Sequence, residues 1–203
     1  MSEGSTTDRR IVRTKGAIRE ALVKLIEAKG FDALLVSDIA EQANINRGTF
    51  YLHYKDKFDL LEKTQEDIIL DIENIVLSAN SLNLADFNSV DKPLPVLVAF
   101  FEYFRENASL MHAILGIEGG TNFQLQIRLT IEKNLKLGFL AGLKEKNFWV
   151  PSDYLISYVM SAHYGVIQTW LENGCIETPR EMAIILSKLS WFGPVRNTGF
   201  VLP

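Results

Sequence analysis

The chain has few of the residues on which several functional classes depend. Its 203 residues include a single cysteine, Cys175, so no disulfide can form within the chain and a structural metal site has little support. The three histidines, His53, His112 and His163, lie far apart in the sequence. No HExxH, GxSxG or CxxC motif and no glycine-rich phosphate loop accompanies them. These absences disfavour an enzyme, and we expect neither a metal nor a cofactor.

Long hydrophobic runs are also lacking. The longest, such as Leu94 to Phe101, are too short and too interrupted to span a bilayer, so we expect no membrane anchor. The amino-terminal MSEGSTTDRR is polar, and no apolar segment that would suit a signal peptide follows it. With one unpaired cysteine, these features predict a cytoplasmic protein.

The chain does contain enough apolar sequence to bury a sizeable core, since 47% of its residues are hydrophobic. Its net charge of −4 is unevenly distributed. Residues 1–57 hold ten Lys/Arg and eight Asp/Glu, whereas residues 58–203 hold eleven and seventeen. A slightly basic amino-terminal part is a mild indication of a surface that faces nucleic acid.

Apolar residues recur at helical spacing along almost the whole chain, and no credible strand pair or internal repeat is present. A first helix is predicted from Asp8 to Lys29. Two short helices follow, behind Ser37 and Asn46 as expected N-cap residues, and a long fourth helix runs from Asp56. The predicted ranges of these three and of the later helices are 37–43, 47–53, 56–79, 96–106, 108–115, 122–146, 152–172 and 179–192.

Residues 36–57 have the internal chemistry of a helix-turn-helix, in which the second helix enters the major groove of DNA. Only three residues, beginning at Asn44, separate the two short helices. Ala40 is small where the helices must cross, and asparagine tolerates the left-handed backbone of a tight turn. The residues expected to pack inward or to support the second helix are Phe50, Leu52 and Tyr54.

The segment VSDIAEQANINRGTFYLHYKDKFDLL, residues 36–61, resembles the helix-turn-helix signature of the tetracycline-repressor (TetR) family, and TFYLHYKDK is its most specific part. The family usually has glycine where this chain has Asn44, and asparagine is the next-best residue for that geometry. The resemblance covers about the first 61 residues; the remainder matches only in length and helical character. It implies an all-α protein with a three-helix DNA-binding domain at 1–57 and a helical-bundle regulatory and dimerisation domain at 58–203, about nine helices in total.

The resemblance also implies DNA contacts. Arg47 would reach base edges, because its planar guanidinium matches guanine O6 and N7. Gly48 would let the helix approach the groove closely, and Thr49 would contact a phosphate or a thymine methyl group. The side chains that would bind backbone phosphates are Ser37, Tyr51, His53 and Lys57.

In this family the carboxyl-terminal helices form a homodimer, and the sequence contains apolar helix faces that would suit such an interface. Segments 152–172 and 179–192 each carry an apolar stripe, and small residues in the first would let helices approach closely. Two such helices per subunit would build a four-helix bundle between subunits, unless the stripes serve only as core within the chain. The expected interface residues are Leu155, Tyr158, Val159, Ala162, Gly165, Val166, Met182, Ile185, Leu186 and Leu189.

Aromatic and sulfur-bearing side chains are concentrated in the middle helices. Such a lining would suit a pocket for a small apolar or aromatic effector, with Tyr103 or His112 as a polar anchor, although aromatic stripes more often form plain core. The candidate lining residues are Phe100, Tyr103, Phe104, Met111, His112, Phe123 and Phe139.

The sequence therefore predicts a homodimeric repressor that binds double-stranded operator DNA and is released by a small-molecule effector. The alternative is a TetR-like activator, or a regulator controlled by a protein partner. The tail 193–203 ends on apolar residues and could dock on its own body or on such a partner. Operator sequence, effector identity and the sign of regulation stay open.

Overall fold

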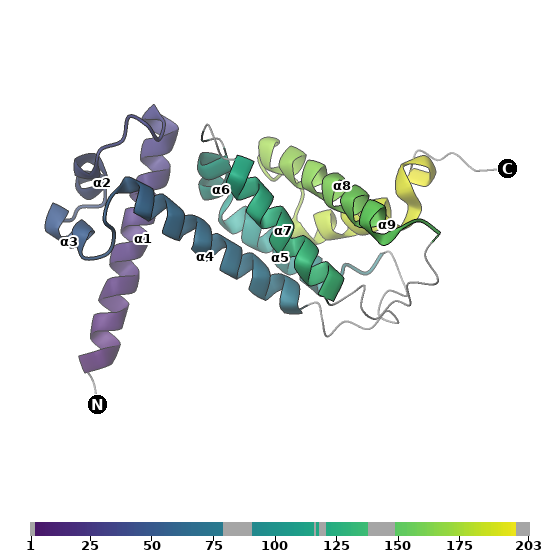
Figure 1. Ribbon diagram of the computed structural model, residues 1–203, viewed down its shortest axis with the longest axis horizontal. Helices are drawn as coiled ribbons and strands as arrows, with labels where there is room; N and C mark the ends of the chain where they lie inside the picture. Colours follow the sequence, from purple (N-terminus) through teal and green to yellow (C-terminus); the bar gives the residue numbers. More distant parts are fainter. Residues whose placement is uncertain (1–2, 79–90, 116, 118–120, 138–148, 198–203) are drawn as a thin grey trace. The chain divides into compact units, whose positions relative to one another are not determined.

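The computed structural model describes residues 3–78, 91–115, 117, 121–137 and 149–197 (Figure 1). Within these ranges the protein consists of nine α helices and no strands, which confirms the predicted all-α fold. No helix in the same ranges is long and apolar enough to cross a membrane. The helices are α1 (Glu3–Lys29), α2 (Val36–Gln42), α3 (Arg47–Tyr51), α4 (Lys57–Ser78), α5 (Pro95–Glu106), α6 (Ala108–Leu115), α7 (Thr121–Leu137), α8 (Ser152–Glu172) and α9 (Pro179–Asn197).

Most helix boundaries follow the local sequence. A capping box begins α9, because the Thr178 N–H donates to Glu181 Oε2 at 2.8 Å and the Glu181 N–H donates to Thr178 Oγ1 at 3.3 Å. Helix α1 begins earlier than Asp8, and α9 continues past Phe192 across a kink at Gly193, where φ is 62°. The last part of the helix predicted over 122–146 lies outside the described residues.

The described helices group into two compact units. The first combines the chain up to Ile68 with Ser109–Gln124, and the second combines Ile69–Ala108 with the chain from Leu125 onward. Helix α4 contributes residues to both units. Segment 109–124 thus packs with the amino-terminal helices, whereas the assignment of functions to 1–57 and 58–203 stays a prediction.

The core of the first unit is one apolar cluster that joins α1, α2, α3 and the start of α4. Helix α1 contributes residues spaced three and four apart, which places them on one helix face. Ile117 packs against the cluster and so ties the 109–124 segment to it. The buried members are Ile18, Ala21, Leu22, Phe31, Leu34, Ile39, Phe50, Tyr54 and Leu60.

The second unit is held by aromatic contacts between its helices. The ring of Phe101 on α5 meets the ring of Trp170 on α8 edge to face at 5.2 Å, and the Trp170 indole N–H donates to the Glu177 carbonyl at 3.1 Å. Helix α9 also packs along α5. Met182 and Leu186 of α9 are buried within this unit.

Candidate DNA-binding site

The turn between α2 and α3 has the left-handed backbone that the sequence predicts. Asn44 has a φ of 53°, and the Ile45 N–H donates to the Ala40 carbonyl at 2.9 Å, which closes the end of α2. Ala40 is 2% exposed, so α3 crosses close to it. The two short helices are therefore fixed in a helix-turn-helix.

Helix α3 is anchored on one face and exposed on the other. Phe50 is fully buried in the core of the first unit, and its ring meets that of Tyr51 edge to face at 5.6 Å. Arg47 and Gly48 are exposed, and Tyr51 is 57% exposed. Since Arg47 and Tyr51 are four residues apart, they lie on one helix face. We call Arg47, Gly48 and Tyr51 the outer face of α3; Thr49 beside them is half-buried.

The expectation for Leu52 is wrong, because its side chain is 81% exposed. Leu52 follows the buried Phe50 by two residues, which is a rotation of about 200° around a helix. Tyr54, in contrast, is 6% exposed and packs against Phe50, as expected.

The start of α2 differs from the prediction, since the N-cap is Leu35 and Ser37 is the second helical residue. Asp38 takes over the capping role by accepting the Leu35 N–H at 3.0 Å. Its hydrogen bond from the Lys29 ammonium, then that from the Leu35 N–H, lower the pKa of Asp38. Lys29 thereby neutralises a carboxylate that would repel a phosphate near the half-buried Ser37.

Lys57 links the start of α4 to the loop after α1. Its ammonium donates to the carbonyl oxygens of Phe31 and Asp32 at 3.1 and 2.8 Å, and lies 5.0 Å from the centre of the Phe31 ring. Asp56 caps α4 by accepting the N–H groups of Phe58 and Asp59 at 2.8 Å each. An ammonium has three N–H donors, so one donor of Lys57 is left for a phosphate.

His53 is half-buried at the end of the recognition region. Burial lowers the pKa of its imidazole from the ordinary 6.5, and the positive charge of Lys15 lowers it further. The ring is therefore uncharged at neutral pH in the free protein. A neutral imidazole can still donate one hydrogen bond to a phosphate.

One exposed residue beside this site was not among the predicted DNA contacts. Asn46 is the N-cap of α3, as expected, but its side chain makes no capping hydrogen bond. Its amide stands at the start of the helix that carries Arg47. From sequence, only its position next to Arg47 could have suggested a DNA contact. An N-cap asparagine ordinarily turns its side chain to the helix amides and is then not available to DNA.

The predicted dimer residues divide into exposed and buried sets. On α8, Tyr158 is 59% exposed and Ala162 and Gly165 are exposed, whereas Met182 and Leu186 on α9 are inside their own unit, where a partner subunit could not reach them. Of the other members, Ile185 and Leu189 are exposed, and the half-buried ones are Leu155, Val159 and Val166. Exposed aromatic residues on the same helices that the prediction omitted are Tyr154, Tyr164 and Trp191.

The predicted pocket residues belong to different units. Phe100 and Phe104 are buried on α5 with ring centres 4.6 Å apart, and the Tyr103 hydroxyl donates to Asp71 Oδ2 at 3.1 Å. Met111 and Phe123, which are buried, and the exposed His112 belong to the first unit. Phe139 lies outside the described residues.

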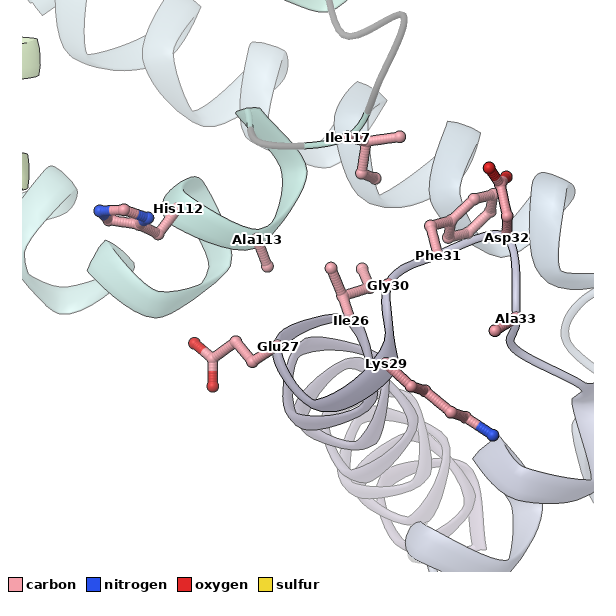
Figure 2. A pocket seen from close by; sticks show the side chains of 10 residues that line it. All are labelled: Ile26, Glu27, Lys29, Gly30, Phe31, Asp32, Ala33, His112, Ala113 and Ile117. Carbon is pink, nitrogen blue, oxygen red and sulfur yellow. The ribbon is translucent and has the colours of Figure 1, made fainter.

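The first unit also has an open hollow of about 510 Å³ between the end of α1 and α6. Figure 2 shows Ile26 of α1 facing Ala113 and Ile117, with the charged Glu27 and Lys29 at the edge. Of the described members of the predicted pocket, His112 alone lines this hollow. In the part of the chain that is described, no three His, Cys, Asp or Glu side chains are grouped as metal ligands would be.

Comparison with known proteins places this geometry in a family. A model of bacterial regulatory proteins of the tetR family matches residues 18–64, and a model of a transcriptional regulator C-terminal region within that family matches residues 91–190. An uncharacterised helix-turn-helix transcriptional regulator, YxbF of Bacillus subtilis, is 32% identical over 93 residues. That match covers 45% of this chain and only about a quarter, 24%, of the relative's length.

Two solved structures share the fold over nearly their whole length. The fatty acid degradation regulator FadR from Bacillus halodurans has a TM-score of 0.65 at 21% identity. The match covers 90% of this chain and 96% of the FadR chain. FadR from Bacillus subtilis, solved in complex with stearoyl-CoA, has a TM-score of 0.60 at 20% identity. The match covers 87% of this chain and 97% of that FadR chain. The two family models together match well over half of the chain, and the protein belongs to the TetR family of DNA-binding transcriptional regulators.

Proposed function

We propose that this protein binds double-stranded operator DNA as a homodimer, through the outer face of α3, and that a small apolar effector controls the binding. The observation that carries the proposal is the arrangement of α3. Its inner face is locked by the fully buried Phe50, while Arg47, Gly48 and Tyr51 face outward. A helix held in this way can enter a major groove without losing contacts of its own fold. The role is one of binding, and no catalytic group is invoked.

Arg47 is the residue that would read sequence. It is exposed in the first turn of α3, and a guanidinium there can donate two parallel hydrogen bonds to guanine. Thr49 and Tyr51, with Ser37, His53 and the remaining donor of Lys57, would contact phosphates and the groove wall.

A dimer is part of the proposal, because one short recognition helix buries little surface on DNA. The exposed apolar residues of α8 and α9, among them Tyr154, Tyr158, Ile185 and Leu189, supply a surface that a second subunit would cover. Ala162 and Gly165, both exposed on α8, leave room for a close helix approach.

The effector is the finer part of the proposal. The concentration of aromatic residues on α5 is the kind of lining that accepts apolar ligands. FadR from Bacillus subtilis shares the fold and was solved with stearoyl-CoA, so long-chain acyl-CoA thioesters are the first compounds to test.

The DNA-binding part is tested with a duplex selected from a random pool by the wild-type protein. Arg47→Ala should lower affinity by about 1–3 kcal/mol, and should relax the sequence preference at the contacted position. Fluorescence anisotropy measures both effects. Arg180→Ala, which removes an exposed arginine from α9, is the matched control and should bind as the wild type does.

Two outcomes would contradict the proposal. Failure of the selection to enrich any duplex would exclude sequence-specific binding. An Arg47→Ala variant with wild-type affinity and preference would remove α3 as the reading helix.

A further inference from the structure

The amino-terminal part of α1 is not used by the core of its unit. From Arg9 onward, the first buried residue on this helix is Ile18, and Ile11 and Val12 before it are 37% and 70% exposed. Residues 9–17 correspond to about 13 Å of helix at the usual rise per residue. Figure 1 shows this end of α1, in purple, continuing past α2 and α3 toward the amino terminus.

This part of α1 is also strongly basic. Arg9, Arg10, Arg13 and Lys15 are all exposed, and no Asp or Glu occurs between Arg9 and Arg19. Among the carboxylates whose side chains are described, from Arg9 onward, none forms an ion pair with any of the four. All four lie beyond the first turn of α1, which begins at Glu3, so the helix dipole gives them no stabilising role. Neither packing nor helix stability accounts for these side chains.

The basic segment begins beside the DNA-facing elements. Lys15 is close enough to His53 for its charge to lower the pKa of that imidazole. One turn further along α1, Ile18 shares a core cluster with Phe50 of α3. The cationic part of α1 is therefore continuous with the surface that carries the proposed DNA contacts.

We propose that residues 9–15 of α1 bind the phosphate backbone of the DNA that flanks each operator half-site. The inference rests on the proposed operator binding and extends it to base pairs that α3 does not reach. Arg9, Arg10 and Arg13 lie within about 100° of one another around the helix, whereas Lys15 lies on another face, so no single face carries all the cations. This distribution suits phosphate contacts and not the reading of bases. The cations of this segment complement the negative charge of the DNA phosphates. The chain as a whole is acidic, so this basic segment stands apart from the rest of the protein.

The test compares two duplexes that contain the same selected operator. One ends at the operator, and the other extends by about one helical turn at each side. Wild-type protein should bind the extended duplex more tightly and with a steeper salt dependence. A variant with Arg9, Arg10 and Arg13 changed to Gln should bind the short duplex as the wild type does and lose the added affinity. Its salt slope on the extended duplex should fall by about 0.9 for each phosphate contact removed.

A matched variant removes the same charge elsewhere. Lys24, Lys92 and Arg180 are exposed, and their change to Gln should leave both affinities and both slopes unchanged. Helicity by circular dichroism should be the same for all proteins, since the substituted side chains are exposed. A charge-retaining variant, with lysine at 9, 10 and 13, should keep the wild-type slope.

The outcomes separate this inference from the proposed function. Equal wild-type affinity and slope on the two duplexes overturns the flanking contact while leaving operator binding intact. Equal losses in the two Gln variants also overturn it, because they would show a general effect of net charge. An amino-terminal variant that binds DNA normally but loses binding to anionic vesicles would reassign the segment to a membrane surface. Absence of any wild-type binding to the selected duplex would instead refute the proposed function.

Discussion

Gly48 stands in the first turn of α3 with open space around the position that a Cβ would occupy. Its own fold therefore does not require glycine there. Gly48→Ala should raise the free energy of unfolding by about 0.5–1 kcal/mol, because alanine favours a helix over glycine. The same methyl group should weaken operator binding by about 1–3 kcal/mol, as extra atoms do in a closely packed contact.

Urea denaturation and anisotropy on the selected duplex measure the two effects of Gly48→Ala separately. Opposite signs would identify Gly48 as a site of close approach to DNA. A more stable variant with undiminished affinity would show that α3 does not approach the groove this closely.

His53 connects DNA affinity to pH. In the free protein, burial and Lys15 hold the pKa of the imidazole below 6.5, and a nearby phosphate would raise it in the complex. The protein would then take up a proton on binding, so affinity should increase as the pH falls through the interval between the two pKa values. The lowered pKa also makes the folded state lose stability in acid, which sets the lower limit of the titration.

Anisotropy titrations from about pH 8 down to about pH 5 measure the effect of His53, because its lowered pKa places the charge change of the free protein below 6.5. His53→Gln should remove most of the pH dependence. If the wild type and the variant gave the same slope, His53 would lie away from the phosphates.

Residue roles could be predicted where they depend on neighbours in the sequence. The left-handed Asn44 follows from the chemistry of one residue in a three-residue turn. Leu52 and Ser37 were misjudged because each depends on the register of a short helix, and a shift of one residue changes which side chain caps and which faces outward.

Helix α4 depends on the link that Lys57 makes to the α1–α2 loop. Lys57→Met keeps an unbranched apolar stem but removes the donors to the carbonyl oxygens of Phe31 and Asp32. We expect the free energy of unfolding to fall by about 1.5–3 kcal/mol, the usual range for hydrogen bonds to a charged group. Urea denaturation of the full chain measures it. Lys55→Met, at an exposed position two residues earlier, is the control and should change stability little.

The Lys57 link also changes how a loss of DNA binding in a Lys57 variant is interpreted. A destabilised start of α4 weakens binding even where no phosphate contact is lost. Lys57→Met with unchanged stability and reduced affinity would assign the side chain to DNA alone. Reduced stability with an unchanged salt slope would assign it to the fold.

At the level of helices, the apolar periodicity predicted α6 and α8 at their observed bounds. The packing partners of the helices could not be predicted in the same way. An apolar stripe is the same whether it meets its own chain or a second subunit, and so Met182 and Leu186 were placed on the dimer surface although they lie inside their unit. The association of residues 109–124 with the first unit depends on contacts distant in sequence, such as that of Ile117.

Dimer formation is the first property of the whole molecule to test. Gly165 is exposed on α8, and a Cβ there would meet open space within the subunit, so Gly165→Phe should fold as the wild type does. A phenyl ring at a close helix crossing between subunits should prevent association and abolish operator binding. Sedimentation velocity and circular dichroism measure the two properties. A wild-type protein that is monomeric under DNA-binding conditions, or a variant that remains dimeric, would remove this interface.

Control by an effector requires coupling between the two units, and α4 is the element that belongs to both. Its first turn is tied to the α1–α2 loop through Lys57, and its later turns to α5 and α7 through Asp71 with Tyr103 and Glu73 with Lys133. A ligand that displaces the later turns would therefore move the start of the helix beside α3. Both recognition helices of a dimer must fit one duplex, so a small change in their separation is enough to lose contacts.

Coupling of this kind is reciprocal by thermodynamic necessity. If stearoyl-CoA binds better to the form that does not bind DNA, it lowers operator affinity by the same factor by which operator lowers its own affinity. That factor is typically about 5–150-fold. Calorimetric titration of stearoyl-CoA into the protein, with and without the selected duplex, gives one side of the cycle, and anisotropy with and without the ligand gives the other. Equal ligand affinities in the two titrations would show that the compound binds without affecting DNA binding. If shorter acyl-CoA thioesters and simple aromatic compounds also failed to bind, control by a protein partner would replace small-molecule control.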